Sequence, residues 1–229
     1  MKHTLLIITA LMLVVGCSSP EPINYEETLN ERDGVFYTKD TNKPYSGQVF
    51  SLYDDGKKKE EGTFKDGKED GLWTAWYENG QKKAEGTFKD GKEDGLWTVW
   101  YENGHKQQEG TFKDGEYDGL WTWWYSDGKK KEEGTFKDGK EDGLWTEWYY
   151  NGQKKYEKTY KDDRQDGLWT GWYDNGQKWF EGTYKDGKKD GKWTGWYENG
   201  QKGYEETYKD GEEISSKCWD ECWKISKHD

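Results

Sequence analysis

The chain has 229 residues, carries a formal net charge of −12 and is 30% hydrophobic, with aromatic side chains alone making up 17%. Only 29 residues are Ala, Val, Ile, Leu, Met or Cys, and twelve of these lie within the first 17 positions. So few aliphatic side chains exclude Rossmann, TIM-barrel and helix-bundle folds, and the high aromatic content excludes a disordered chain.

The first 16 residues have the pattern of a secretion signal. After a short basic start, residues 4–15 form an apolar run that is too short for a membrane-spanning helix, which needs about 20 residues. The run ends in Val-Val-Gly-Cys at positions 14–17, which resembles the lipobox of bacterial lipoproteins. This resemblance implies removal of residues 1–16 and lipidation of Cys17. The alternative is a signal peptide with an incidental cysteine.

A lipid on Cys17 predicts a location at the cell envelope. Ser18 follows the cysteine where aspartate would indicate inner-membrane retention, so we expect the outer membrane if the cell has two membranes. Without residues 1–16 the chain keeps 34 basic and 47 acidic side chains, a net charge of −13. Such a surface repels nucleic acid and anionic lipid headgroups. We therefore expect no nucleic-acid partner, and membrane contact through the N-terminal lipid only.

Residues 17–46 lie between the signal and the folded repeats and divide into two segments. Residues 17–33 are polar and acidic, which is typical of a tether between the lipid and a folded domain. Residues 34–46 contain the β-branched and aromatic run Val35-Phe36-Tyr37, which predicts a strand. We expect this segment to form an N-terminal cap.

A 24-residue period governs residues 47–214, which hold seven copies of one unit. Tryptophan recurs at this step at Trp73, Trp97, Trp121, Trp145, Trp169 and Trp193. The first copy is degenerate, since Val49 stands at the tryptophan position. Within a unit, residues 72–77 and 82–88 favour strands, and Asn79-Gly80 is a strong signal for a two-residue hairpin turn. The unit is therefore predicted to be a β-hairpin.

A two-residue turn fixes which residues of the hairpin lie opposite each other. It pairs Tyr77 with Lys82, Ala75 with Ala84 and Trp73 with Gly86. We expect the Trp73 indole to lie over Gly86, which has no side chain. We also expect Trp73, Tyr77 and Phe88 to share one face, so that stacked units form aromatic ladders, each ring pair adding about 0.5–1.5 kcal/mol.

The pattern G-x-W-x-x-W-Y-x-N-G followed by E-G-x-F/Y-x-x-G resembles the MORN repeat, in particular the bacterial variant grouped as YwqK-type antitoxin proteins. The resemblance implies an all-β fold: an elongated, single-layer antiparallel sheet of successive hairpins. Fourteen strands would make a rod about 65 Å long. Asp163 replaces a turn glycine, and Lys158 and Glu206 replace the glycine opposite tryptophan. We expect bulges in those units.

A second tryptophan row points away from the Trp73 face by strand alternation. It consists of Trp76, Trp100, Trp124, Trp148, Trp172 and Trp196. Two interpretations stay open. Either the sheet coils so that this row packs on itself, or the row is an exposed aromatic strip that binds a partner.

Residues 215–229 leave the repeat and contain Cys218 and Cys222. Outside the cytoplasm these two thiols tend to oxidise, so a disulfide that closes a small loop is one hypothesis. Free or intermolecular thiols are a second. A metal site is a weak third, because one cysteine pair without further ligands is a poor zinc signal.

No catalytic motif is present, and we expect neither an enzyme, nor a metal site, nor a cofactor. The aspartates at 24-residue spacing, Asp70, Asp94, Asp118, Asp142, Asp166 and Asp190, are better explained by turn chemistry than by ion binding. The favoured function is a lipid-anchored, non-catalytic envelope scaffold that binds an unknown envelope protein or a second copy of itself. The alternatives are a cell-wall glycan-binding module and an antitoxin-like neutraliser of an exported target.

Overall fold

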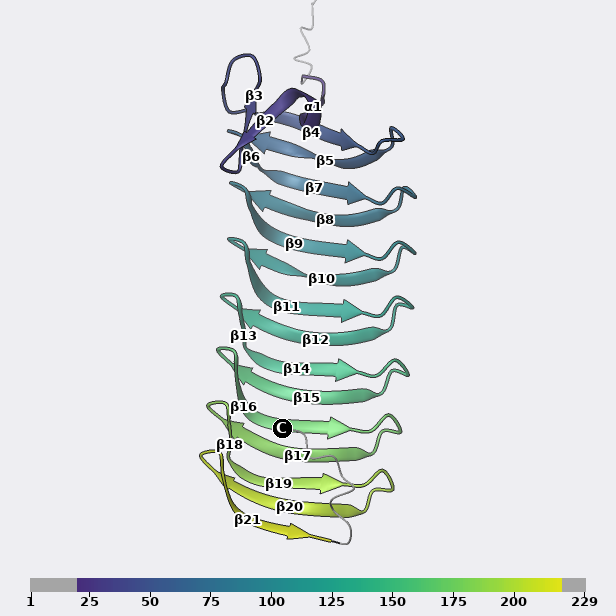
Figure 1. Cartoon of the computed structure of the whole chain (residues 1–229), viewed down its shortest axis with the longest axis vertical. Coiled ribbons are helices and arrows are strands. Elements are labelled where there is room, and N and C mark those ends of the chain that lie inside the picture. Colours follow the sequence, from purple (N-terminus) through teal and green to yellow (C-terminus); the bar gives the residue numbers. More distant parts are fainter. Residues whose placement is uncertain (1–19, 220–229) are drawn as a thin grey trace, which may run out of the picture.

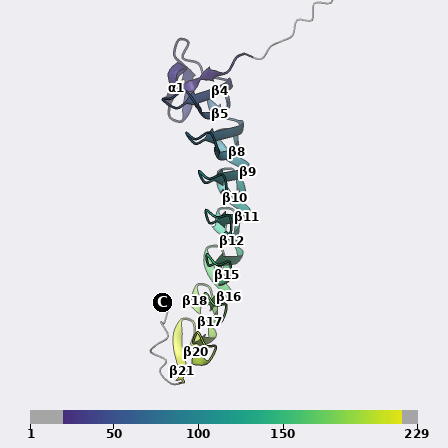
Figure 2. The same cartoon turned by 90° about the vertical axis from the view of Figure 1, so that its right-hand side faces the viewer.

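The computed structural model describes residues 20–219 as a tall, single-layer sheet whose strands lie across its long axis (Figure 1). Seen from the side, the molecule is one layer thick over most of its length, and the N-terminal segment is packed at one end (Figure 2). Within residues 20–219, no helix is both long and apolar enough to span a membrane. The expected all-β, single-layer architecture is confirmed.

The sheet contains 19 strands, and successive repeat strands pair antiparallel. The strands of the repeat region are β4 (Gly47–Leu52), β5 (Lys58–Lys65), β6 (Lys68–Glu69), β7 (Gly71–Trp76), β8 (Lys82–Lys89), β9 (Lys92–Trp100), β10 (Lys106–Lys113), β11 (Glu116–Trp124), β12 (Lys130–Lys137), β13 (Lys140–Glu141), β14 (Gly143–Trp148), β15 (Lys154–Lys161), β16 (Arg164–Trp172), β17 (Lys178–Lys185), β18 (Lys188–Lys189), β19 (Gly191–Trp196), β20 (Lys202–Lys209) and β21 (Glu212–Cys218).

The N-terminal segment covers the first repeat. It comprises β1 (Ile23–Asn24), α1 (Tyr25–Thr28), β2 (Leu29–Arg32) and β3 (Val35–Thr38). Strand β1 pairs parallel with β4, and Leu29 is buried beside Val49 and Phe64. The Phe36 ring stacks on Phe64 with centroids 4.4 Å apart. The tether predicted for residues 17–33 is therefore shorter than expected, because these apolar side chains fold residues 23–32 onto the sheet end.

The predicted register is confirmed in the middle of the hairpin and wrong near its tip. Trp73 pairs with Gly86 and Ala75 with Ala84, as expected. Lys82, however, pairs with Trp76, because Lys83 is an extra residue in a β-bulge. The same shift recurs near the tip of each hairpin.

The hairpin tip is a three-residue loop, not the predicted two-residue turn. The Gly80 N–H donates to the Tyr77 carbonyl at 2.8 Å, and the Tyr77 N–H donates to the Gln81 carbonyl at 2.9 Å. Of the Asn79-Gly80 pair only Gly80 has a positive φ, 84°. This is the pattern of a turn closed by a glycine bulge. The Asn79 side-chain oxygen accepts the Gln81 N–H at 2.9 Å, which stabilises the loop.

The two-residue turns lie at the opposite edge, where one repeat passes into the next. Lys65 pairs with Lys68 around Asp66 and Gly67, whose φ values are 50° and 80°. Positive φ at both central residues identifies a type I′ turn. Asp163 takes the glycine place with φ 64°, and its carboxylate accepts the Glu141 N–H at 2.7 Å. This bond supports a backbone conformation that a non-glycine residue seldom adopts.

The core of the rod is a column of rings on one face of the sheet. Trp73 contacts Phe88 with centroids 6.1 Å apart, Phe88 contacts Trp97 at 5.3 Å, and Trp97 contacts Phe112 at 6.0 Å, all edge to face. The expected ladder of these rings is confirmed. The indole lies over a different glycine, however: a Cβ on Gly62 would meet the Trp73 ring at 2.2 Å, so Trp73 covers the preceding repeat rather than Gly86 of its own hairpin.

Tyr77 and its equivalents join neighbouring repeats by hydrogen bonds rather than by ring stacking. The Tyr77 hydroxyl donates to the Trp100 carbonyl at 2.7 Å, 23 residues further along the chain. The equivalent bonds from Tyr53, Tyr101, Tyr125, Tyr149 and Tyr173 measure 2.6–2.8 Å. Each repeat is therefore joined to the next by a tyrosine hydroxyl, whereas the sequence had indicated only a ring contact for this residue.

The expected bulges are present after Lys158 and Glu206, but the same register shift occurs in repeats without these substitutions, so the substitutions are not its cause. The turn at Asp163 is not bulged. Lys158 stands where a glycine would lie under Trp169, and its Nζ is 5.8 Å from the centroid of that ring. Glu206 pairs with Ser216 in β21, where the repeat has ended and Lys217 stands at the position of the next tryptophan.

Candidate functional site

The two faces of the sheet differ in how much the residues at equivalent positions vary from one repeat to the next. The Trp73 face carries Trp73, Ala75, Ala84, Phe88 and their equivalents, and the Trp76 face carries Leu72, Thr74, Trp76, Lys82, Glu85, Thr87 and theirs. On the Trp76 face these residues are the same in all six full copies, except that Lys192 replaces leucine. On the Trp73 face the pair at 75 and 84 changes in every copy.

On the Trp76 face each tryptophan ring is covered by a lysine from the preceding repeat. Lys82 Nζ lies 5.8 Å from the Trp100 ring centroid, and the six equivalent distances to Trp76, Trp100, Trp124, Trp148, Trp172 and Trp196 run from 5.4 to 5.9 Å. Lys82 also forms an ion pair with Glu85. The sheet stays a single open layer (Figure 2) and does not coil around this row.

Beside the tryptophans runs a row of exposed leucines. Leu72, Leu96, Leu120, Leu144 and Leu168 have exposed fractions of 57%, 60%, 55%, 56% and 50%. Each is directed away from the ring column that forms the core. These five exposed aliphatic side chains do not take part in the ring column, and a row of them is a candidate contact surface.

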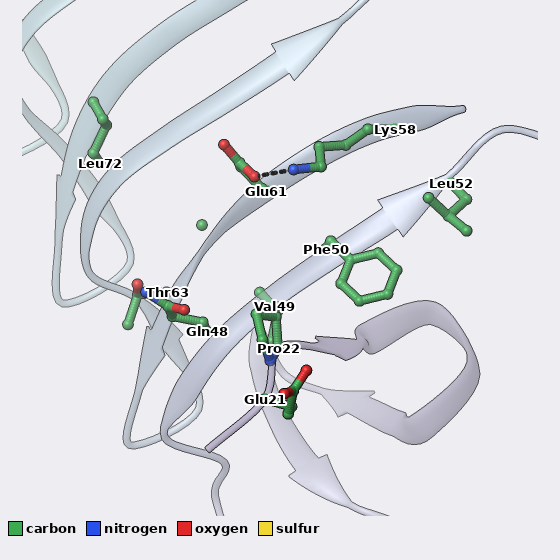
Figure 3. Close-up of a pocket in the computed structure, with 11 residues that line it drawn as sticks. Glu21, Pro22, Gln48, Val49, Phe50, Leu52, Lys58, Glu61, Thr63 and Leu72 are labelled. Atoms are coloured by element: carbon green, nitrogen blue, oxygen red, sulfur yellow. Dashed lines mark hydrogen bonds and ion pairs between the residues drawn. The ribbon is translucent and has the colours of Figure 1, made fainter. Parts of the chain in front are cut away.

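Hollows lie between the leucine row and the lysine–glutamate pairs near both ends of the Trp76 face. The one at the first repeat has a volume of about 610 Å³ and is lined by Phe50, Leu52, Leu72 and the Lys58–Glu61 ion pair (Figure 3). It forms where Leu52 stands in place of tryptophan. A second, of about 420 Å³, lies beside Trp196.

On the Trp73 face, charged side chains interrupt the column of aromatic rings at Glu132 and Glu147. Glu132 lies directly opposite Glu147, and Lys158 Nζ is 2.6 Å from a Glu147 oxygen. Burial, followed by the charge of Glu147, raises the pKa of Glu132. Burial alone would lower the pKa of Lys158, but the hydrogen bond and charge of Glu147 raise it. The lysine thus offsets two like charges that would otherwise destabilise the pairing.

The 24-residue step seen in these contacts is also the step of a known repeat family. The model described as the MORN repeat variant matches seven segments: 45–66, 69–90, 93–114, 117–138, 141–162, 165–186 and 189–210. Together these segments cover more than half of the chain. The chain belongs to the MORN repeat variant family. No curated protein matches its sequence.

MORN repeats suggest a scaffold for protein or membrane interaction, and a chain built only from them is typically non-catalytic. Within residues 20–219 there is no group of three or more His, Cys, Asp or Glu side chains placed to hold a metal ion. The constant Trp76 face and the changing Trp73 face are therefore the candidate binding surfaces of this MORN rod.

The aspartate row supports turns between MORN repeats. Asp190 Oδ2 accepts the Asp210 N–H at 3.3 Å, and Asp166 Oδ2 accepts the Asp186 N–H at 3.2 Å. The turn chemistry expected for these residues acts across repeats rather than within one.

The predicted cysteine sites lie at the edges of the described chain. Cys17 and Cys222 are outside residues 20–219, so the lipid anchor stays a prediction. Cys218 ends β21 and is disulfide-bonded in the structure. Its pairing with Cys222 also stays a prediction.

The leucine row was missed at the sequence level although its signal was present. Leucine recurs at the 24-residue step directly before five of the six Trp73-type residues, so alternation places it on the other face. An aliphatic residue repeated at a solvent-facing strand position was the available clue.

Proposed function

We propose that this chain is a lipid-anchored, non-catalytic scaffold of the cell envelope that binds a protein partner through the Trp76 face. The observation that carries the proposal is the exposed leucine row described above. Its five members are two strands apart, about 9.6 Å, so the row extends over about 38 Å of the rod.

The composition of this face favours a protein partner over a glycan. Sugar rings stack on free aromatic faces, but each ring of the Trp76 row has a lysine Nζ within 6 Å of its centroid on one side. Leucine side chains offer a sugar no stacking surface, whereas they suit the apolar centre of a protein interface. The flanking Lys82–Glu85 pairs would form its polar rim.

The envelope location in this proposal depends on Cys17. The apolar run before it, the Val-Val-Gly-Cys ending and Ser18 support export, lipidation and placement at the outer membrane of a two-membrane cell. Cys17→Ser tests this step. We expect the variant to leave the membrane fraction and appear in the soluble fraction. A variant that stays with the membrane would refute the lipid anchor.

A photo-cross-linking residue at Leu120 in intact cells tests the partner. Leu120 lies in the middle of the leucine row, and the control position is Asp138, an exposed residue in a type I′ turn at the sheet edge. We expect a discrete protein adduct from Leu120 only, lost in the Leu96→Ser/Leu144→Ser background. The purified partner should then bind the purified chain.

The other adducts have definite meanings. Adducts at multiples of the chain mass would show that a second copy covers the face. Glycan adducts would show that the Trp76 face binds the cell wall and not a protein. An exported toxin as the adduct would retain the scaffold and identify it as a neutraliser. Equal adducts from Leu120 and Asp138 would refute the proposed surface.

A further inference from the structure

A hollow of about 310 Å³ opens on the Trp73 face at the second repeat. Its walls are aromatic rings from three successive repeats and the N-terminal segment, namely Tyr25, Phe36, Phe64, Trp73, Phe88 and Trp97. Its floor is the directly opposed pair Ala75 and Ala84. Two methyl groups cannot fill the space between rings, so the ring column here has an open middle.

In the fourth and sixth repeats the equivalent position on the same face is filled. Trp123 stacks between Trp121 and Trp145, with centroids 5.9 and 5.7 Å away. In the sixth repeat Phe180 lies over Gly171, where an added Cβ would meet its ring at 2.5 Å. The hollow therefore results from the small side chains of Ala75 and Ala84 in this repeat and is not a general feature of the repeat unit.

Carboxylates give this hollow a negative charge. Glu60 and Glu69 both line it, and Glu60 Oε2 accepts the Tyr25 hydroxyl at 2.7 Å. Burial raises the pKa of Glu69, and the negative charges of Glu31, Glu93 and Glu60 raise it further. The lysine at the rim, Lys83, has its Nζ 5.9 Å from the Tyr77 ring centroid.

We propose that this hollow binds a small organic cation of the alkylammonium class. The faces of aromatic rings attract cations, best when the cation is desolvated, and a quaternary ammonium also packs its methyl groups against the rings. Glu60 and Glu69 supply the opposite charge. A bare metal ion does not fit these walls, since hard cations require several oxygen ligands at once.

The shape of the hollow favours a free small molecule over a side chain of a bound protein. Its volume is at the lower end for ligand sites, about 300–1,000 Å³. Tyr25 of α1 and Phe36 of β3 wall it at the N-terminal end of the rod, so a polymer cannot continue past it along the face in that direction. The site is on the opposite face from the leucine row and does not depend on the proposed protein partner.

The test is calorimetric titration of the mature protein with choline and, separately, with 3,3-dimethylbutan-1-ol, its neutral isostere. We expect choline to bind about tenfold more tightly than the neutral compound, the ratio that corresponds to roughly 1.4 kcal/mol of cation-specific attraction. Glu69→Gln should weaken choline binding about fivefold or more. Glu132→Gln, which removes a half-buried carboxylate two repeats away on the same face, should leave it unchanged.

A double variant fills the hollow without introducing a foreign pair. Ala75→Gly with Ala84→Phe copies the Gly171–Phe180 pair of the sixth repeat, so the fold should be retained by circular dichroism. Choline binding should be lost. Equal affinities for choline and its isostere would overturn the proposal, as would undiminished binding to the filled variant. Binding of a trimethyllysine peptide without binding of choline would also overturn it, because the ligand would then be a protein.

Discussion

Gly110→Ala tests whether the indole-over-glycine contact holds neighbouring repeats together. Gly110 has a φ that any residue can adopt, so an alanine there is not strained by the backbone. In a strand, alanine is on general grounds more stable than glycine by about 0.5–1 kcal/mol. Without the indole, the substitution should therefore stabilise the protein.

The structure predicts the opposite sign. The new Cβ would lie 2.1 Å from Trp121 Cδ2, at least 1.3 Å closer than ordinary contact allows. Trp121 is fully buried, with the Tyr117 ring centroid 4.3 Å and the Phe112 centroid 5.0 Å away, so it has no space to retreat. Overpacking costs about 1–3 kcal/mol, and losing the 3.0 Å bond from Trp121 Nε1 to the Thr111 carbonyl adds about 1 kcal/mol. We expect a net loss of about 1–3.5 kcal/mol once the alanine preference is subtracted.

The assay is urea unfolding followed by circular dichroism, for Gly110→Ala alone and in a Trp121→Val background. Valine is chosen because Val49 occupies this position in the first repeat. In that background Gly110→Ala should cost nothing or stabilise slightly. An equal loss in both backgrounds would refute the steric explanation and leave a backbone effect as the cause.

Three further substitutions test the contacts between repeats. Tyr101→Phe removes one hydroxyl bond to the next repeat and should lower the unfolding free energy by about 1 kcal/mol in urea melts, whereas an unchanged midpoint would show that the tyrosine row contributes only its rings. Asp163→Ala keeps a positive φ but loses the carboxylate hydrogen bond, so we expect the free energy of unfolding to fall by about 1–2 kcal/mol. Asp163→Asn should be near neutral. Equal losses in both variants would exclude a contribution from this bond. Glu132→Gln should stabilise the protein at pH 7 by about 0.2–1 kcal/mol by removing a like-charge pair. Because the pKa of Glu132 is raised in the fold, the wild type gains stability from this group as the pH falls through that raised value toward about 4.3, so the advantage of the variant should fade over this range in pH-dependent melts.

The 24-residue period and the turn signal were enough to predict the hairpin unit and the pairing of Ala75 with Ala84, and the resemblance to MORN repeats implied the single layer. The bulge was not predictable in the same way. Lys82 and Lys83 are both polar, so the hydrophobic pattern does not fix which one continues the strand. The choice depends on the closing glycine turn, whose geometry emerges only with the whole loop.

The direction of the indoles shows a second limit of sequence reasoning. Trp97 is paired with Gly110 on one side and with Gly86 on the other, so the pairing allows the ring to cover either glycine. The structure places it over Gly86. The side-chain rotamer decides this, and alternation along a strand carries no information about it.

The hollow at Ala75 and Ala84 was not predicted, for a related reason. The sequence places Ala75 opposite Ala84, but the pairing alone does not show how much space two small side chains leave between the neighbouring rings. In later copies the same two positions hold pairs such as Gly171 and Phe180, which contain one large ring. A small pair where other repeats carry a large ring is the sequence sign of an open space in the ring column.

The crosswise direction of the strands gives the rod a specific response to tension. Strands lie across the long axis, so the hydrogen bonds between antiparallel neighbours point along it (Figure 1). We therefore expect a force applied to the two ends to break these hydrogen bonds one strand pair at a time, so that the hairpins open in succession. Each opened repeat releases 24 residues, about 80 Å of extended chain, in place of the roughly 10 Å that it spans in the sheet. Under load we therefore expect the molecule to lengthen in steps of about 70 Å, the difference between these two lengths.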